Sequence, residues 1–228
     1  MLNTLGNRLP SVGNRNNGVV VSDEMFSVRI VPVVVLHDAH DAEPLGRALM
    51  AGGLPVAEVT FRTAAAADSI RAMAAIEGLI VGAGTVLNPA QVEQAVSAGA
   101  QFIVSPGLRH DVVLAAQAAG VPVLPGAVTP SEIMAAQELG LDTVKFFPAN
   151  VYGGAAAIKA LSAPFGGMRF VPTGGVSASN ISDYLSLGCV PAVGGSWMVP
   201  VDAIREGAFT SVTELCRDAV AAAAAVGK

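Results

Sequence analysis

Residues 121–148 read VPVLPGAVTPSEIMAAQELGLDTVKFFP and hold two apolar runs on either side of a helical pattern. The first run, Val121–Leu124, favours a buried strand. Thr129 then stands directly before a proline, a helix-start signal that predicts a helix over Pro130–Leu139. The second run, Asp142–Phe147, favours another strand. This stretch therefore predicts a strand–helix–strand unit, in which the helix connects two parallel strands.

The same alternation recurs along most of the chain. Apolar runs that predict eight strands lie at Arg29–Leu36, Val56–Phe61, Leu79–Ala83, Gln101–Ser105, Val121–Leu124, Asp142–Phe147, Arg169–Pro172 and Val190–Val193. Helical patterns rich in Ala, Leu and long polar residues lie at Ala42–Ala51, Ala64–Ile76, Pro89–Ala98, Asp111–Ala119, Pro130–Leu139, Ala155–Leu161, Ala178–Leu187 and Val201–Arg205. One more helix is expected at about 210–226. Several patterns end in Gly, as helix C-termini often do.

Eight strand–helix repeats favour a closed (β/α)8 (TIM) barrel that forms a single domain. The alternative is an open doubly wound sheet. No G-x-G-x-x-G follows the first run, and Gly82-Ala83-Gly84 is only a fragment of that motif, which weighs against a dinucleotide-binding fold. We expect the barrel and its C-terminal helix to span residues 25–228. Residues 1–24 are rich in Asn, Gly and Ser and predict a flexible N-terminal arm.

The composition excludes several classes of protein. Of 228 residues, 52% are hydrophobic and 14% are charged, so the chain can bury a core and is not disordered as a whole. The mean hydropathy is +0.56, but no run reaches the roughly 20 apolar residues that span a bilayer. The N-terminus lacks the apolar segment of a signal peptide, and we expect a cytoplasmic protein. A net charge of −5 argues against nucleic acid as the main partner.

Metal binding is not expected either. The two cysteines, Cys189 and Cys216, are too few for a zinc cluster or a disulfide framework. His37 and His40 are three residues apart, but no acidic or cysteine cluster joins them in an established ligand spacing.

Residues 56–62 read VAEVTFR and place polar side chains on one face of a predicted strand. Side chains alternate between faces, so Glu58, Thr60 and Arg62 share the face that points into the barrel. A buried carboxylate and guanidinium are costly unless they are paired or used in function. A structural ion pair between Glu58 and Arg62 is the alternative to a catalytic role.

Lys145 lies near the end of the sixth predicted strand and also points inward by parity. Lysine is rarely buried without a reason, and a neutral lysine amine can attack a carbonyl to form a Schiff base. The alternative is a lysine that is simply neutralised by a carboxylate. Of the other two lysines, Lys159 lies in a helical pattern and Lys228 ends the chain, so neither competes for this role.

Two glycine-rich segments follow the seventh and eighth predicted strands, where barrels often bind phosphate. They read PTGGV at 172–176 and VGGSW at 193–197. Glycines let backbone N–H groups approach phosphate oxygens, a helix N-terminus would add a favourable dipole, and Ser196 can add a hydroxyl. Plain tight turns are the alternative. Two further residues at strand ends, Thr85 and Pro106, are candidates for a carboxylate contact and a pocket wall.

In these residues the chain resembles the KDPG/KHG aldolase family, class I aldolases that cleave 2-keto-3-deoxy-6-phosphogluconate. The resembling stretches run through about residues 28–200 in the family's order: EVTFRT at 58–63, GAGTVLNP at 82–89, SPGL at 105–108, PG at 125–126, KFFPA at 145–149, PTGGV at 172–176 and GGSW at 194–197.

The resemblance implies a (β/α)8 barrel, a homotrimer, and no metal or organic cofactor. It implies that Lys145 is the Schiff-base lysine and Glu58 the general acid/base. It also implies that Arg62, Thr85 and Pro106 contact pyruvate and its carboxylate. The implied phosphate contacts are Thr173, Gly174, Gly175, Gly194, Gly195 and Ser196. The sequence departs from the family at His37, where some relatives have a basic residue, and at Asn150, where relatives often have an acid.

The resemblance implies cleavage of 2-dehydro-3-deoxy-6-phospho-D-gluconate to pyruvate and D-glyceraldehyde 3-phosphate. The alternatives are a 4-hydroxy-2-oxoglutarate aldolase and an aldolase for the galactonate epimer, both with the same lysine chemistry. A phosphate-binding barrel isomerase or synthase and a non-catalytic sugar-phosphate sensor are further alternatives outside the lyases. The C4 stereochemistry and the direction of the reaction stay open at this point.

Overall fold

The computed structural model describes residues 23–227. Residues 1–22 of the predicted arm therefore lie outside the described residues. Asp23 and Glu24, which the prediction assigns to the arm, instead form a short 3-10 helix, η1 (Asp23–Phe26). The side chains of Met25 and Phe26 in this helix are buried, whereas Glu24 is exposed.

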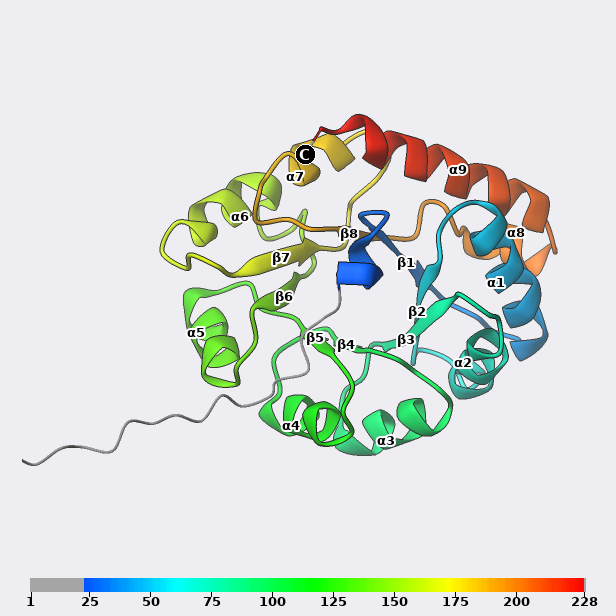
Figure 1. Ribbon diagram of the computed structural model, residues 1–228, viewed down its shortest axis with the longest axis horizontal. Helices are drawn as coiled ribbons and strands as arrows, with labels where there is room; N and C mark the ends of the chain where they lie inside the picture. Colours follow the sequence, from blue (N-terminus) through cyan, green and yellow to red (C-terminus); the bar gives the residue numbers. More distant parts are fainter. Residues whose placement is uncertain (1–22, 228) are drawn as a thin grey trace, which may run out of the picture.

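Eight short parallel strands form the centre of the molecule (Figure 1). They are β1 (Ile30–Val34), β2 (Val56–Thr60), β3 (Ile80–Gly84), β4 (Ile103–Ser105), β5 (Val123–Pro125), β6 (Thr143–Phe146), β7 (Arg169–Pro172) and β8 (Val193–Gly195). Six of them pair in the order β5-β4-β3-β2-β1-β8, and β6 pairs with β7. Two single bridges, Gly126 with Lys145 and Thr173 with Gly194, join these two sheets at both seams. The strands therefore close into a ring, which confirms the predicted (β/α)8 barrel.

The helices surround this ring (Figure 1). They are η2 (Ala39–Asp41), α1 (Ala42–Ala51), α2 (Ala66–Ala74), α3 (Pro89–Ser97), α4 (His110–Ala118), α5 (Pro130–Glu138), α6 (Gly154–Ser162), α7 (Ile181–Leu185), α8 (Val201–Arg205) and α9 (Phe209–Ala225). The C-terminal helix α9 packs against α1, α7 and α8. Within residues 23–227, no helix has both the length and the apolar character needed to cross a membrane.

The predicted bounds of two elements differ from the structure by three residues at the N-terminal end, more than those of the other elements. The helix predicted at Ala178–Leu187 is only Ile181–Leu185, because Asn180 closes a turn with Ser177 before the helix begins. The strand predicted at Val190–Val193 is displaced to Val193–Gly195, where it pairs with Ile30–Pro32 of β1. Gly194 and Gly195 therefore belong to the strand itself and not to the loop after it. The apolar run ends before them because glycines carry no side chain to bury.

The barrel interior has its own packed core at the N-terminal ends of the strands. Met25 and Phe26 of η1 pack there against side chains from five strands: Val31, Val56, Val104, Leu124 and Val171. Phe102, just before β4, and Ala192, just before β8, complete this cluster. In Figure 1 the blue helix η1 lies across the centre of the ring. This end is thus occupied by side chains, and barrels of this kind bind their ligands at the carboxyl ends of the strands.

Candidate active site

Lys145 on β6 and Glu58 on β2 meet inside the barrel. Lys145 Nζ donates to Glu58 Oε1 at 2.9 Å and to Oε2 at 3.2 Å. Lys145 is 5% exposed and Glu58 is 2% exposed. The two strands lie on opposite sides of the ring, and the two residues are 87 positions apart in sequence. The structure thus confirms that both side chains point inward, as their parity predicts.

Local sequence explains why the Glu58 carboxylate fits there. On the neighbouring strand β3, Gly84 pairs with Thr60, and a Cβ atom on Gly84 would lie 2.2 Å from Glu58 Oε1. Glycine at this position leaves the room that the carboxylate occupies. Thr60, which shares the inward face, donates its hydroxyl to the Val34 carbonyl of β1 at 3.0 Å. Thr60 therefore links strands, and Glu58 is the group that faces Lys145.

Arg62 and Thr85 lie together at the carboxyl ends of β2 and β3. Arg62 Nε donates to Thr85 Oγ1 at 3.3 Å. Thr85 has a positive φ of 57°, a conformation that non-glycine residues rarely adopt and that often marks functional positions. The structural alternative of a Glu58–Arg62 ion pair is wrong, since Glu58 pairs with Lys145. Lys145 is paired with a carboxylate, as the alternative interpretation predicts. That carboxylate belongs to Glu58, the predicted general acid/base.

A cavity of about 330 Å³ opens at this end of the barrel. Its lining residues are Val33, Val35, Arg62, Phe147, Thr173, Gly174, Gly175, Val176, Gly195, Ser196, Val199 and Val201. Phe147 also lies beside the lysine of the buried pair, since Lys145 Nζ is 5.4 Å from the centroid of its ring. The cavity is therefore adjacent to the amine. Of the described lining residues, Arg62 alone carries a positive charge.

The two glycine segments meet beside this cavity. Gly174 and Gly175 have φ values of 93° and 74°, which only glycine adopts without strain. Thr173 bridges to Gly194, and a Cβ on Gly194 would lie 2.2 Å from Thr173 Oγ1. Gly195 in turn is covered by the ring of Trp197, which an added Cβ would meet at 2.0 Å. These glycines thus allow close packing as well as turns.

Neither glycine segment leads directly into a helix, but Val201, the first residue of α8, lines the cavity, and a favourable contribution from a helix N-terminus stays a prediction. Helix α7 begins only at Ile181, after a turn, and α8 begins at Val201, after Pro200. Backbone N–H groups and the Thr173 and Ser196 hydroxyls remain as the donors for an anion.

The structure does not bring every predicted site residue to the cavity. Within residues 23–227, the lining does not include Pro106, Thr85, Gly194, Glu58 or Lys145. Pro106 lies just after β4, beside the end of the neighbouring strand β5, where a Cβ on Gly126 would meet the Pro106 carbonyl oxygen at 2.0 Å. Thr85 reaches the cavity only through Arg62.

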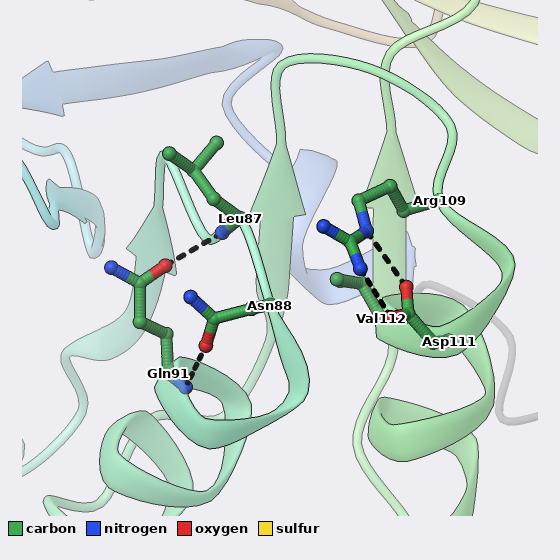
Figure 2. Close-up of polar contacts among 6 residues, drawn as sticks. All are labelled: Leu87, Asn88, Gln91, Arg109, Asp111 and Val112. Carbon is green, nitrogen blue, oxygen red and sulfur yellow. Dashed lines mark hydrogen bonds and ion pairs between the residues drawn. The ribbon is translucent and has the colours of Figure 1, made fainter.

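Hydrogen bonds at the starts of α3 and α4 hold the loops that carry Thr85 and Pro106 (Figure 2). Asn88 Oδ1 accepts from the Gln91 N–H at 3.0 Å, and Gln91 Oε1 accepts from the Leu87 N–H at 2.7 Å. In the next loop, Arg109 forms a two-pronged ion pair with Asp111. The hydrogen bond from Arg109 holds the pKa of the Asp111 carboxyl below its ordinary value.

Sequence reasoning missed two residues that shape this site. Phe147 borders both the cavity and Lys145. It stands two residues after Lys145 in the sequence KFFP, so the alternation of strand side chains could have placed both on the same face. Asn180 forms a hydrogen bond with Gly175 of the first glycine segment, with no comparable signal in the strand pattern. In the described part of the chain, no three His, Cys, Asp or Glu side chains are grouped to hold a metal ion.

Comparisons with known proteins agree with this arrangement. The model of the KDPG and KHG aldolase family matches residues 21–215. The "KHG/KDPG aldolase" of Escherichia coli K12 is 48% identical over 192 residues, which cover 84% of this chain and 90% of that protein. The 2-dehydro-3-deoxy-phosphogluconate aldolase of Dickeya dadantii is 47% identical over 197 residues, 86% of this chain and 92% of that protein.

A solved structure shows the same fold with a reaction intermediate bound. It is the KDPG aldolase of Legionella pneumophila with pyruvate captured at low pH as a covalent carbinolamine. The match has a TM-score of 0.83 and 39% identity, and it covers 86% of this chain and 97% of that one.

Proposed function

The chain belongs to the KDPG and KHG aldolase family and is therefore an aldolase, a carbon–carbon lyase, and we propose that it cleaves 2-dehydro-3-deoxy-6-phospho-D-gluconate to pyruvate and D-glyceraldehyde 3-phosphate. The observation that carries the proposal is the buried Lys145–Glu58 pair beside a cavity lined by Arg62 and two glycine segments. The residues proposed as nucleophile, acid/base and anion-binding groups thus lie at one end of the barrel.

The first step needs a neutral amine. Glu58 lies 2.9 Å from Lys145 Nζ and can accept its proton directly, which leaves both groups uncharged in the buried interior. The amine then adds to the C2 ketone of the substrate to give a carbinolamine. Glu58 then gives the proton it took from the lysine to the departing C2 hydroxyl, so the carbinolamine loses water to give an iminium and Glu58 is again a carboxylate. The iminium is the electron sink for the next step.

Cleavage follows from the iminium. Glu58, directly or through a water, removes the proton of the C4 hydroxyl, the C3–C4 bonding electrons move toward the iminium nitrogen, and the aldehyde leaves. An enamine of pyruvate remains on Lys145. Return of a proton to C3 and hydrolysis of the resulting iminium release pyruvate and restore the lysine.

The two anionic ends of the substrate are held by different groups in this proposal. Arg62, supported by Thr85, binds the pyruvate carboxylate and so orients the ketone, while Pro106 forms a wall beside the imine. The donors assigned to the phosphate lie in the two glycine segments: Thr173, Gly174, Gly175, Gly194, Gly195 and Ser196.

The names of the relatives cover both KDPG and KHG, so the finer substrate assignment needs its own test. We expect the purified protein to release pyruvate from the D-gluconate substrate with a higher kcat/KM than from its C4 epimer or from 4-hydroxy-2-oxoglutarate. Pyruvate release can be followed with lactate dehydrogenase and NADH. A higher kcat/KM for 4-hydroxy-2-oxoglutarate would contradict the assignment. The isomerase and sensor alternatives do not fit a member of an aldolase family.

The proposal also includes the homotrimer and the cytoplasmic location that the sequence predicts. Light scattering coupled to size exclusion tests the trimer, since a monomeric or dimeric mass would contradict it.

A further inference from the structure

The Asn180 side chain forms a hydrogen bond with the first glycine segment, residues 172–176, at Gly175. Its Nδ2 donates to the Gly175 carbonyl at 2.8 Å, and its Oδ1 accepts from the Ser177 N–H at 2.9 Å. Its own N–H donates to the Ser177 carbonyl at 3.3 Å. One side chain therefore uses both a donor and an acceptor on the stretch from Gly175 to Ser177.

This stretch needs such support because glycine supplies none. Gly174 and Gly175 are consecutive residues with positive φ, and glycine loses more conformational freedom on ordering than any other residue. The loop after β6 restrains the other side of the pair, where the Asn150 N–H donates to the Gly174 carbonyl at 3.1 Å. The Asn150 side chain lies against Gly175, since an added Cβ there would be 2.4 Å from Asn150 Cγ.

The orientation of this segment matters for anion binding. Gly174, Gly175 and Val176 line the cavity, whereas Asn180 is not among its described lining residues. Arg62 is the only cation in that described lining, so an anion near the glycines depends on oriented N–H groups and hydroxyls. A small rotation of the Gly175 peptide would turn these dipoles away from the anion.

We propose that Asn180 is a positioning residue that fixes the Gly174–Gly175 segment for the phosphate of the substrate. This inference rests on the phosphate assignment in the proposed function. It assigns Asn180 no contact with substrate and no part in the lysine chemistry.

Two substitutions separate this role from that of a helix cap. Asn180→Asp keeps the acceptor for Ser177 and puts an equally favoured residue type at the N-cap position of α7, where the Asn180 side chain forms no cap hydrogen bond, but it loses the donor to Gly175. Asn180→Ala removes both groups and adds no charge. A merely structural cap would tolerate Asp and be weakened by Ala, whereas positioning of Gly175 requires the amide donor that both variants lack.

The measurement is aldehyde addition to pyruvate with two acceptors, glyceraldehyde 3-phosphate and glyceraldehyde. We expect both variants to raise KM for the phosphorylated acceptor about tenfold and to leave KM for glyceraldehyde and for pyruvate unchanged. Ser179→Ala is the matched control, because it breaks the 2.9 Å contact with the Ser177 hydroxyl in the same turn without touching Gly175. The control should match the wild type with both acceptors.

Inorganic phosphate is the independent probe. In the wild type it should compete with glyceraldehyde 3-phosphate and change the fluorescence of Trp197, the only tryptophan, which covers Gly195. Both variants should weaken this binding by a similar factor. If either variant keeps the wild-type KM and phosphate affinity, the inference is wrong while the proposed function stands. If the wild type shows neither phosphate binding nor a preference for the phosphorylated acceptor, the phosphate assignment itself fails, and the inference with it.

Discussion

At the scale of single residues, the site depends on a buried ion pair that is expensive to form and easy to disturb. Lys145 and Glu58 are both almost completely buried, so each is stable there chiefly because the other is present. Removing either partner would leave an uncompensated charge in the barrel. A residue that only leaves space for the pair therefore gives a cleaner test. Its substitution displaces the Glu58 carboxylate or the Lys145 amine but leaves both groups present.

Gly84→Ala tests this geometry. The new methyl would lie 2.2 Å from Glu58 Oε1 and would displace the carboxylate, so we expect kcat to fall about 100-fold. Gly188→Ala is the control, because an added Cβ there meets no atom of the described residues within 4 Å. Circular dichroism should show both variants folded. Full turnover by a folded Gly84→Ala protein would contradict the catalytic placement of Glu58.

At the scale of elements, the order of strands and helices was predictable, and the exceptions have local causes. Continuous apolar runs and proline-marked helix starts, such as Pro89 and Pro130, predict their elements to within a few residues. The strand at Gly194 was not predictable from apolarity. Gly194 and Gly195 have no side chain to bury, and the close packing of Thr173 and Trp197 leaves no room for one. The short α7 depends on the hydrogen bonds of Asn180, which no periodic pattern contains.

Helix α5 gives a prediction with a pH dependence. Burial raises the pKa of Glu132, but hydrogen bonds from the N–H groups of Val128 and Thr129 and from the Thr129 hydroxyl outweigh it, so the pKa is lowered overall. A lowered pKa in the folded state means that the carboxylate stabilises the fold above the ordinary glutamate pKa. This contribution is lost as the pH falls through the folded-state value.

We therefore expect Glu132→Gln to lower the free energy of unfolding by about 0.3 to 1 kcal/mol at pH 7, because the exposed part of the side chain screens the effect. The difference from the wild type should shrink as the pH falls below about 4. Urea unfolding across this range measures it, with Glu138→Gln at the other end of α5 as the control. A difference that stays constant with pH would disprove the role of the carboxylate charge.

At the scale of the whole molecule, closure of the barrel creates the site. Glu58 and Lys145 come from opposite sides of the ring and meet only when the bridges at Gly126 and Thr173 join the two sheets. Parity could predict that each side chain points inward, but not that their atoms are 2.9 Å apart, which depends on the closed geometry. The filled N-terminal end of the barrel then leaves the carboxyl end for chemistry.

Met25→Ala tests the importance of that filled end. Met25 is 2% exposed in the interior core, so its truncation should lower the free energy of unfolding by about 2 to 4 kcal/mol. Met134→Ala is the matched control, since Met134 is 55% exposed and should change stability by less than about 0.5 kcal/mol. The folded Met25→Ala enzyme should keep its turnover. Equal stability changes in the two variants would show that η1 does not close the barrel.

The most direct test of the central claim is borohydride reduction in the presence of pyruvate, followed by mass mapping of the lysine peptides. We predict a reduced pyruvyl adduct on Lys145 and none on Lys159, which is exposed on α6. Lys145→Arg, which keeps a cation beside Glu58, should form no adduct. An adduct confined to Lys159, or trapping by Lys145→Arg at the wild-type level, would contradict the assignment of Lys145 as the Schiff-base lysine.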